Sequence, residues 1–136
     1  MTPGRAAAVA ALSLALTACA SPGEPRCGPG EHLAVQDSLY FGTGKPDGIV
    51  TTEEWVGFLE STVTPRFPQG LTVSQASGQW RGANGSIVRE STHVLQLMHP
   101  NDSGSDGSIA EIVAFYKARF QQEAVLRVRV PACVSF

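Results

Sequence analysis

The order of the predicted strands and helices is the feature that most narrows the folds open to this chain. Short apolar or alternating runs bounded by turn residues predict four strands, and apolar residues at helical spacing predict two helices. In chain order they are a strand at 35–41, a helix at 51–64, strands at 71–80 and 87–98, a helix at 108–120 and a strand at 125–130. Right-handed crossovers place both helices on one face of a four-stranded antiparallel sheet. The sequence therefore predicts an α+β domain with the ferredoxin-like βαββαβ fold.

Capping motifs predict where the two helices begin. Thr51 is followed three residues later by Glu54, and Ser108 is followed in the same way by Glu111. This spacing is typical of a capping box, in which two side chains satisfy the free backbone amides at a helix start. We therefore expect the helices to start at Thr51 and Ser108.

Two helices on one side leave the second face of the sheet uncovered. The period-two alternation of strand side chains predicts that Tyr40, Gln96, Arg127 and Arg129 lie on that face among apolar neighbours. Such a face must be polar, be covered by a partner, or form a ligand site. We therefore expect either a homodimer or a ligand pocket there.

The first 18 residues have the parts of a secretory signal peptide. Arg5 precedes an apolar run at 6–16, and small residues then lead to a cysteine. The sequence LTAC at 16–19 fits the bacterial lipobox, so we expect Cys19 to carry lipid and to anchor the protein on the extracytoplasmic side of a membrane in the cell envelope. The sequence ACA at 18–20 also fits ordinary signal cleavage. Both alternatives export the protein.

Cleavage at this position leaves 118 of the 136 residues, a common size for one domain. Prolines and glycines predict a tether at 19–34, and the domain is expected at 35–136. Nine basic and twelve acidic side chains remain, which gives a net charge of −3. The sequence contains no cluster of basic residues, so we expect no binding to nucleic acid.

The two cysteines that remain beside Cys19 are Cys27 and Cys133. In an oxidising compartment such a pair usually forms a disulfide, which would connect the tether to the last strand. A redox-active pair is the alternative. That alternative is less favoured because the two cysteines do not form a C-x-x-C motif.

Several short motifs resemble a known bacterial family. They are TPRFPQGLTV at 64–73, GQWR at 78–81, IVRE at 87–90 and VLRV at 125–128, and together with Phe41-Gly42 they span most of 35–136. In these motifs the chain resembles the family of domain of unknown function 3574. The resemblance implies an exported or lipid-anchored envelope protein with no assigned activity, and it brings no catalytic residues.

The candidate ligand-binding residues are Tyr40, Trp80, Glu90 and Arg127. The leading hypothesis is non-catalytic binding of a small ligand or a protein partner through the uncovered face. The alternative is a small enzyme, in which Tyr40, Glu90 and Arg127 supply proton transfer and anion stabilisation. A purely structural envelope component is the third possibility. Glu90 is expected to pair with Arg81 or Arg127 rather than to act as a general base.

The motifs indicate neither a metal site nor a cofactor. Gly44-Lys45 is followed by Pro46, where a phosphate-binding loop has Ser or Thr. His93 and His99 lie six residues apart on one predicted strand, a separation of about 20 Å that is too long for a shared metal ion. We therefore expect no metal and no cofactor.

Overall fold

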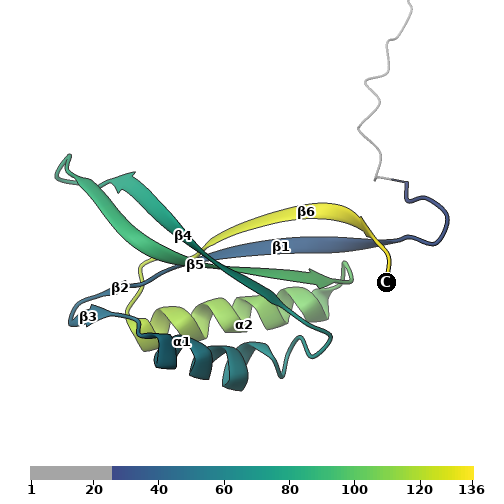
Figure 1. The fold of residues 1–136 in the computed structure, drawn as a ribbon, viewed down its shortest axis with the longest axis horizontal. Helices are drawn as coiled ribbons and strands as arrows, with labels where there is room; N and C mark the ends of the chain where they lie inside the picture. The colour runs from purple at the N-terminus through teal and green to yellow at the C-terminus, as the bar shows by residue number, and fades with distance from the viewer. Residues whose placement is uncertain (1–25) are drawn as a thin grey trace, which may run out of the picture.

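The computed structural model describes residues 26–136, so the predicted signal peptide and Cys19 lie outside the described residues. Four strands form an antiparallel sheet in the order β4-β5-β1-β6. They are β1 (His32–Gly42), β4 (Thr72–Arg81), β5 (Ile87–His99) and β6 (Leu126–Val134). Two helical segments cover one face, namely α1 (Thr52–Phe58), continued by the π-helix η1 (Leu59–Val63), and α2 (Ser103–Phe120) (Figure 1). The predicted ferredoxin-like fold is confirmed.

A second, two-stranded sheet joins β1 to α1. It consists of β2 (Gly44–Lys45) and β3 (Gly48–Ile49). β1 itself begins at His32, within the last residues assigned to the tether. The main sheet therefore extends to within five residues of Cys27.

The capping box is confirmed for α1 and wrong for α2. The Thr51 hydroxyl accepts from the Glu54 amide at 3.2 Å, and the Glu54 carboxylate accepts from the Thr51 amide at 2.9 Å. α2 instead begins at Ser103, where the N-cap Asp102 accepts from the amide of Ser105. The short polar residues after His99 resemble a loop in sequence, but one carboxylate at the N-cap is enough to start the helix there.

No helix of residues 26–136 has both the length and the apolar character needed to cross a membrane.

The core lies between the helices and the covered face of the sheet. The side chains of Leu39, Phe41, Leu95 and Leu97 point from β1 and β5 towards the helices and are essentially inaccessible to solvent. Facing residues of the helices are Trp55, Phe58, Val63, Ile109, Ile112, Tyr116 and Phe120. The Tyr116 hydroxyl donates to the Gly42 carbonyl at 2.9 Å, which attaches α2 to the end of β1.

The prediction that Arg127 and Arg129 lie on the uncovered face is wrong. Arg127 pairs with Leu39 in the β1–β6 register, so both residues point to the helix side of the sheet. Leu126 and Val128 of β6 lie instead on the uncovered face, 60% and 42% exposed. The strand takes this orientation because β6 is an edge strand, where its arginines reach carboxylates of β1 and α2.

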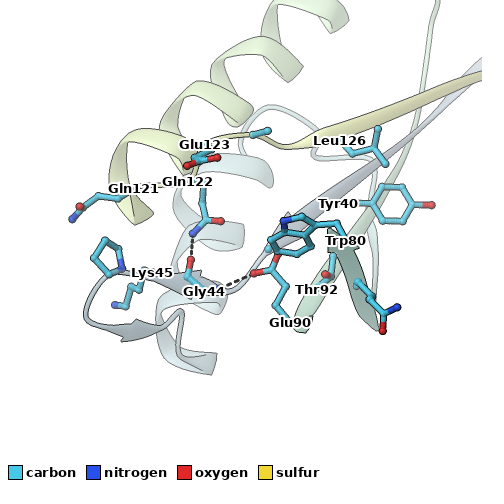
Figure 2. A pocket seen from close by; sticks show the side chains of 15 residues that line it. Tyr40, Gly44, Lys45, Trp80, Glu90, Thr92, Gln121, Gln122, Glu123 and Leu126 are labelled. Atoms are coloured by element: carbon cyan, nitrogen blue, oxygen red, sulfur yellow. Dashed lines mark hydrogen bonds between the residues drawn. The ribbon is translucent and has the colours of Figure 1, made fainter. Parts of the chain in front are cut away.

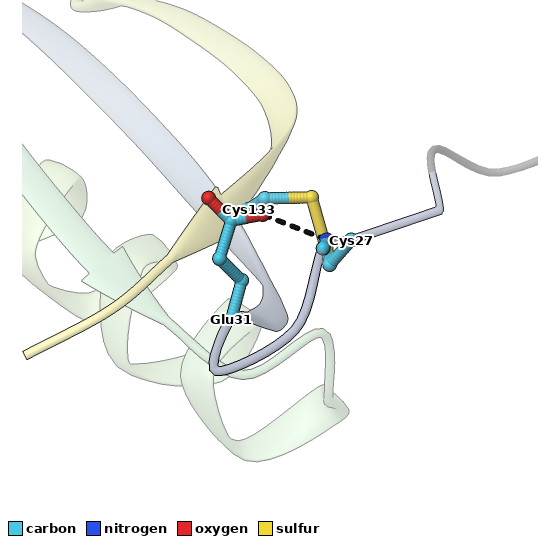
Figure 3. Close-up of a disulfide and its surroundings, with 4 residues drawn as sticks. Cys27, Glu31 and Cys133 are labelled. Atoms are coloured by element: carbon cyan, nitrogen blue, oxygen red, sulfur yellow. Dashed lines mark hydrogen bonds between the residues drawn. A yellow bond between two sulfur atoms is a disulfide. The ribbon is translucent and has the colours of Figure 1, made fainter.

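The predicted disulfide between Cys27 and Cys133 is confirmed. Their Cα atoms are 5.4 Å apart, and the bridge joins the segment before β1 to the end of β6 (Figure 3). Next to it, Glu31 accepts a hydrogen bond from the Gly28 amide at 2.8 Å, which closes the turn that leads into β1. The bridge therefore fixes the chain just before it enters the sheet.

Candidate functional site

A cavity of about 670 Å³ lies at the end of the sheet where β1 leaves it (Figure 2). Nearby, the β4–β5 hairpin projects beyond the helices (Figure 1). The walls come from all four strands of the main sheet, from the β2–β3 connection and from the segment after α2. The lining residues are Tyr40, Gly42, Gly44, Lys45, Pro46, Gly78, Gln79, Trp80, Glu90, Thr92, Gln121, Gln122, Glu123, Ala124 and Leu126. Distant parts of the sequence thus meet at a concave site, as is usual for small-molecule sites.

Glycines on both sides of Glu90 create the space for this cavity. Glu90 of β5 pairs with Gly78 of β4, and on the other side its carboxylate lies over Gly42 of β1. A Cβ on residue 42 would lie only 2.9 Å from Cδ of Glu90. Because residue 42 carries no side chain, the Glu90 carboxylate can lie over the backbone of β1, while Gly78 leaves the cavity free of a side chain on the β4 side.

The Glu90 carboxylate has a single hydrogen bond to the described chain. Its Oε2 accepts from the backbone amide of Gly44 at 3.2 Å (Figure 2). Gln122 donates to the carbonyl of the same glycine, which fixes this turn from the other side. Lys45 also lines the cavity, but its ammonium is bound to Glu54 at 2.8 Å. Within residues 26–136, Glu90 therefore has no ion-pair partner.

Two aromatic side chains contribute to the wall. Trp80 comes from β4 and Tyr40 from β1, and both are on the same face of the sheet as Glu90 (Figure 2). The Trp80 side chain is 47% exposed, and Tyr40 is half-buried. A tryptophan that is exposed at the edge of a cavity leaves a large planar surface available for a ligand.

The structure brings together three of the four predicted ligand-binding residues. Tyr40, Trp80 and Glu90 line the cavity, whereas Arg127 lies on the opposite face of the sheet. The prediction that Glu90 pairs with Arg81 or Arg127 is wrong as well, because strand alternation places both arginines on the other face. The Gly44 amide takes the role that was expected of an arginine.

A second cluster of charged residues, which the sequence analysis missed, lies beneath β1 and β6. Asp37 of β1 is fully buried. Arg127 donates to both of its carboxylate oxygens, at 2.7 and 2.6 Å, and Nε2 of His99 lies 2.7 Å from Oδ2. Arg127 and Arg129 also donate to Asp106 in the first turn of α2, at 2.7 and 2.8 Å. The cluster therefore connects the edge strand, β1, β5 and α2.

Hydrogen bonding favours the charged forms of Asp37 and Arg127. Burial raises the pKa of Asp37, but the hydrogen bonds from Arg127 and His99 outweigh it, so the pKa lies below its ordinary value. The pKa of Arg127 is raised, chiefly by its hydrogen bond to Asp37. His99 lines a second cavity of about 520 Å³, but its Nδ1 faces the Pro100 carbonyl at 2.7 Å and its Nε2 faces Asp37. Neither ring nitrogen is free to accept a substrate proton, so we assign this cluster a structural role.

The other buried histidine also has a packing role. His93 stacks on Trp55 with ring centroids 4.3 Å apart. Burial lowers the pKa of His93, which favours the neutral ring. Among residues 26–136 there is no group of three or more His, Cys, Asp or Glu residues placed to hold a metal ion.

Comparisons with known proteins place this geometry in context. A phage SAM lyase in complex with S-methyl-5′-thioadenosine has a TM-score of 0.56 at 16% identity, over 82% of this chain and 95% of the lyase. CutA from Synechococcus elongatus PCC7942 has a TM-score of 0.53 at 10% identity, over 77% of this chain and 83% of CutA. At such identities the similarity shows the fold alone. No curated protein sequence matches the chain. Residues 36–136 match the family described as protein of unknown function (DUF3574), and the chain therefore belongs to that family.

Proposed function

We propose that this protein is an exported binding protein that takes up a small organic molecule in the cavity over Glu90. The observation that carries the proposal is the convergence of Tyr40, Trp80 and Glu90 on one open cavity. A volume of about 670 Å³ lies within the range of about 300–1,000 Å³ that is common for small-molecule sites. The aromatic rings supply apolar contact, and the carboxylate supplies a polar group that can orient a ligand.

Removal of the tryptophan ring provides the test of ligand binding. We expect the protein purified from its own host to carry a small molecule that native mass spectrometry detects as added mass. Trp80→Ala should reduce the occupied fraction about tenfold, because it removes a large planar part of the wall. Ile87→Ala is the matched control, since Ile87 is exposed on the same hairpin but does not line the cavity. A wild-type protein without added mass, or equal occupancy in Trp80→Ala, would contradict the proposal.

The export part of the proposal has a separate basis. The signal peptide at 1–18 and the lipobox cysteine, Cys19, predict a lipid anchor, and a disulfide such as Cys27–Cys133 is typical of oxidising compartments. Intact-mass measurement of the mature protein should give a chain that starts at Cys19 with the added mass of lipid. A chain that still starts at Met1 would contradict export, and an unmodified chain without Cys19 would contradict the anchor.

A small enzyme is the second candidate, and the phage SAM lyase similarity is the observation that favours it. In that case Glu90 would be the charged side chain available to act on a bound substrate. Its Oε1 has no hydrogen-bond partner among the described residues. Incubation of the purified protein with SAM, followed by chromatography for S-methyl-5′-thioadenosine, tests this candidate directly. Formation of the product in wild type and its loss in Glu90→Gln would favour the enzyme over the binding protein.

A further inference from the structure

The charges around the cavity do not balance. Its ionisable side chains are Lys45, Glu90 and Glu123, together with the half-buried phenol of Tyr40. Lys45 is neutralised by Glu54, to which its ammonium donates two hydrogen bonds at 2.8 and 3.0 Å. The cavity therefore presents uncompensated negative charge, and a half-buried carboxylate is stabilised by an opposite charge close to it.

The position of Glu90 is defined by the backbone rather than by a basic side chain. The Gly44 amide binds Oε2, while Oε1 has no hydrogen-bond partner in the described part of the chain. The negative charge of Glu90 is also felt inside the domain, where it contributes, after burial, to the raised pKa of Tyr116. A carboxylate held in place with one free oxygen at an open cavity is well suited to a positively charged ligand.

The aromatic walls fit the same kind of ligand. The faces of tryptophan and tyrosine rings attract cations through their quadrupole, and such sites recognise quaternary ammonium groups. Trp80 and Tyr40 come from strands on either side of β5, the strand that carries Glu90. Trp80 lies beside Glu90, and the Tyr40 ring lies farther along the same wall (Figure 2). A cation paired with Glu90 can therefore lie against the Trp80 ring, with Tyr40 extending the aromatic surface.

We infer that the ligand of this cavity is an organic cation of the ammonium or sulfonium class, with Glu90 as its counter-ion and Trp80 and Tyr40 as its aromatic walls. The inference rests on the proposed function. A divalent metal ion fits less well, because calcium requires about six to eight oxygen ligands and magnesium an octahedral set. Carboxylates at this cavity come from Glu90 and Glu123 only, among the residues that line it.

The test uses two probes of nearly equal shape, choline and its neutral carbon analogue 3,3-dimethyl-1-butanol. Isothermal titration of the purified protein should show choline binding at least tenfold more tightly than the neutral alcohol. Glu90→Gln should weaken choline binding about tenfold and leave the alcohol unchanged, because it removes charge and little volume. Glu60→Gln is the matched control, since it changes net charge equally at an exposed position that does not line the cavity.

Gly42→Ala provides a second variant that leaves the carboxylate in the protein. The new Cβ would meet the flexible end of Glu90 rather than backbone, so we expect the carboxylate to move while the fold persists. Choline binding should fall in this variant too, with an unchanged circular dichroism spectrum.

The outcomes separate the inference from the proposed function. Equal affinity for the two probes, or choline affinity that is unchanged in Glu90→Gln, would overturn the cation inference. In that case, loss of the co-purified mass in Trp80→Ala would still support a small-molecule site. A wild-type protein that binds choline no better than Glu90→Gln does, and that carries no co-purified mass, would overturn both.

Discussion

Replacing Asp37 by alanine is expected to lower the free energy of unfolding by about 3–5 kcal/mol. Asp37 is fully buried and accepts hydrogen bonds from Arg127 and His99. Without the carboxylate, Nε2 of His99 would remain in the interior without its acceptor, Arg127 would keep only its contact with Asp106, and a cavity would replace the lost volume. Urea denaturation monitored by circular dichroism measures this loss, provided that the slope of the unfolding free energy against urea concentration is the same in variant and wild type.

Asp106→Ala is the matched control for this prediction. Asp106 also binds Arg127, at 2.7 Å, but its side chain is 40% exposed, so water can replace the lost contacts. We expect a much smaller loss than for Asp37→Ala. Equal losses in the two variants would show that burial of Asp37 adds nothing to the stability of the cluster.

The same carboxylate should make stability depend on acid pH. Its pKa in the folded protein is lowered, so its contribution is present above the unfolded pKa of about 3.9 and is lost as the pH falls through the folded value. Between pH 5 and pH 3 the wild type should therefore lose more stability than Asp37→Asn, in which this group cannot titrate. Thermal unfolding of both proteins over that range measures the difference. If the stability of the two proteins fell equally over this pH range, the assignment of the acid-dependent loss to Asp37 would be contradicted.

Local sequence patterns were sufficient to predict the fold. The helix-covered face of β1 is marked by Leu39 and Phe41, and the Thr51 box marks the start of α1 because a capping box needs only four residues. The start of α2 was misplaced because its first turn carries no such clear local motif. Asp102 caps the helix, but the residues after it, including Gly104, have low helix propensity and read as a loop.

The candidate site was predicted in part, and the part that failed depends on long-range contacts. The structure places Tyr40, Trp80 and Glu90 on one face of the sheet, which strand alternation fixes once the pairing register is known. For Arg127, strand alternation allows either the helix-covered or the uncovered face. The apolar residues Leu126 and Val128 favoured the assignment of Arg127 to the uncovered face. That assignment failed because an edge strand can expose apolar residues.

The buried cluster did leave a signal in the sequence. Asp37 lies an even number of residues from the core residues Leu39 and Phe41, so all three point to the same face of the sheet. The same holds for His99 with Leu95 and Leu97. A carboxylate at an inward position requires a partner. The partner could not be named, because Asp37 and His99 are 62 residues apart and meet only through the sheet register.

Removing the Cys27–Cys133 disulfide is expected to lower the free energy of unfolding by about 2–5 kcal/mol. The bridge joins residues 106 positions apart, and a cross-link over so long a loop strongly restricts the unfolded chain. Chemical denaturation of the double variant Cys27→Ser/Cys133→Ser, compared with the wild type, measures the loss. Wild-type protein treated with a reducing agent is the matched control and should unfold at the same denaturant concentration as the double variant.

The structural effect of this loss should be confined to one end of the β1–β6 pair. The bridge lies next to His32 and Val134, which form the first pair of that register. Farther along β1, the buried contacts between Asp37 and Arg127 hold the two strands together without the bridge. Hydrogen exchange in the double variant should therefore accelerate at 32–34 and 132–134 and stay slow around Asp37. Uniform acceleration along both strands would instead show that the edge strand depends on its cross-link over its whole length.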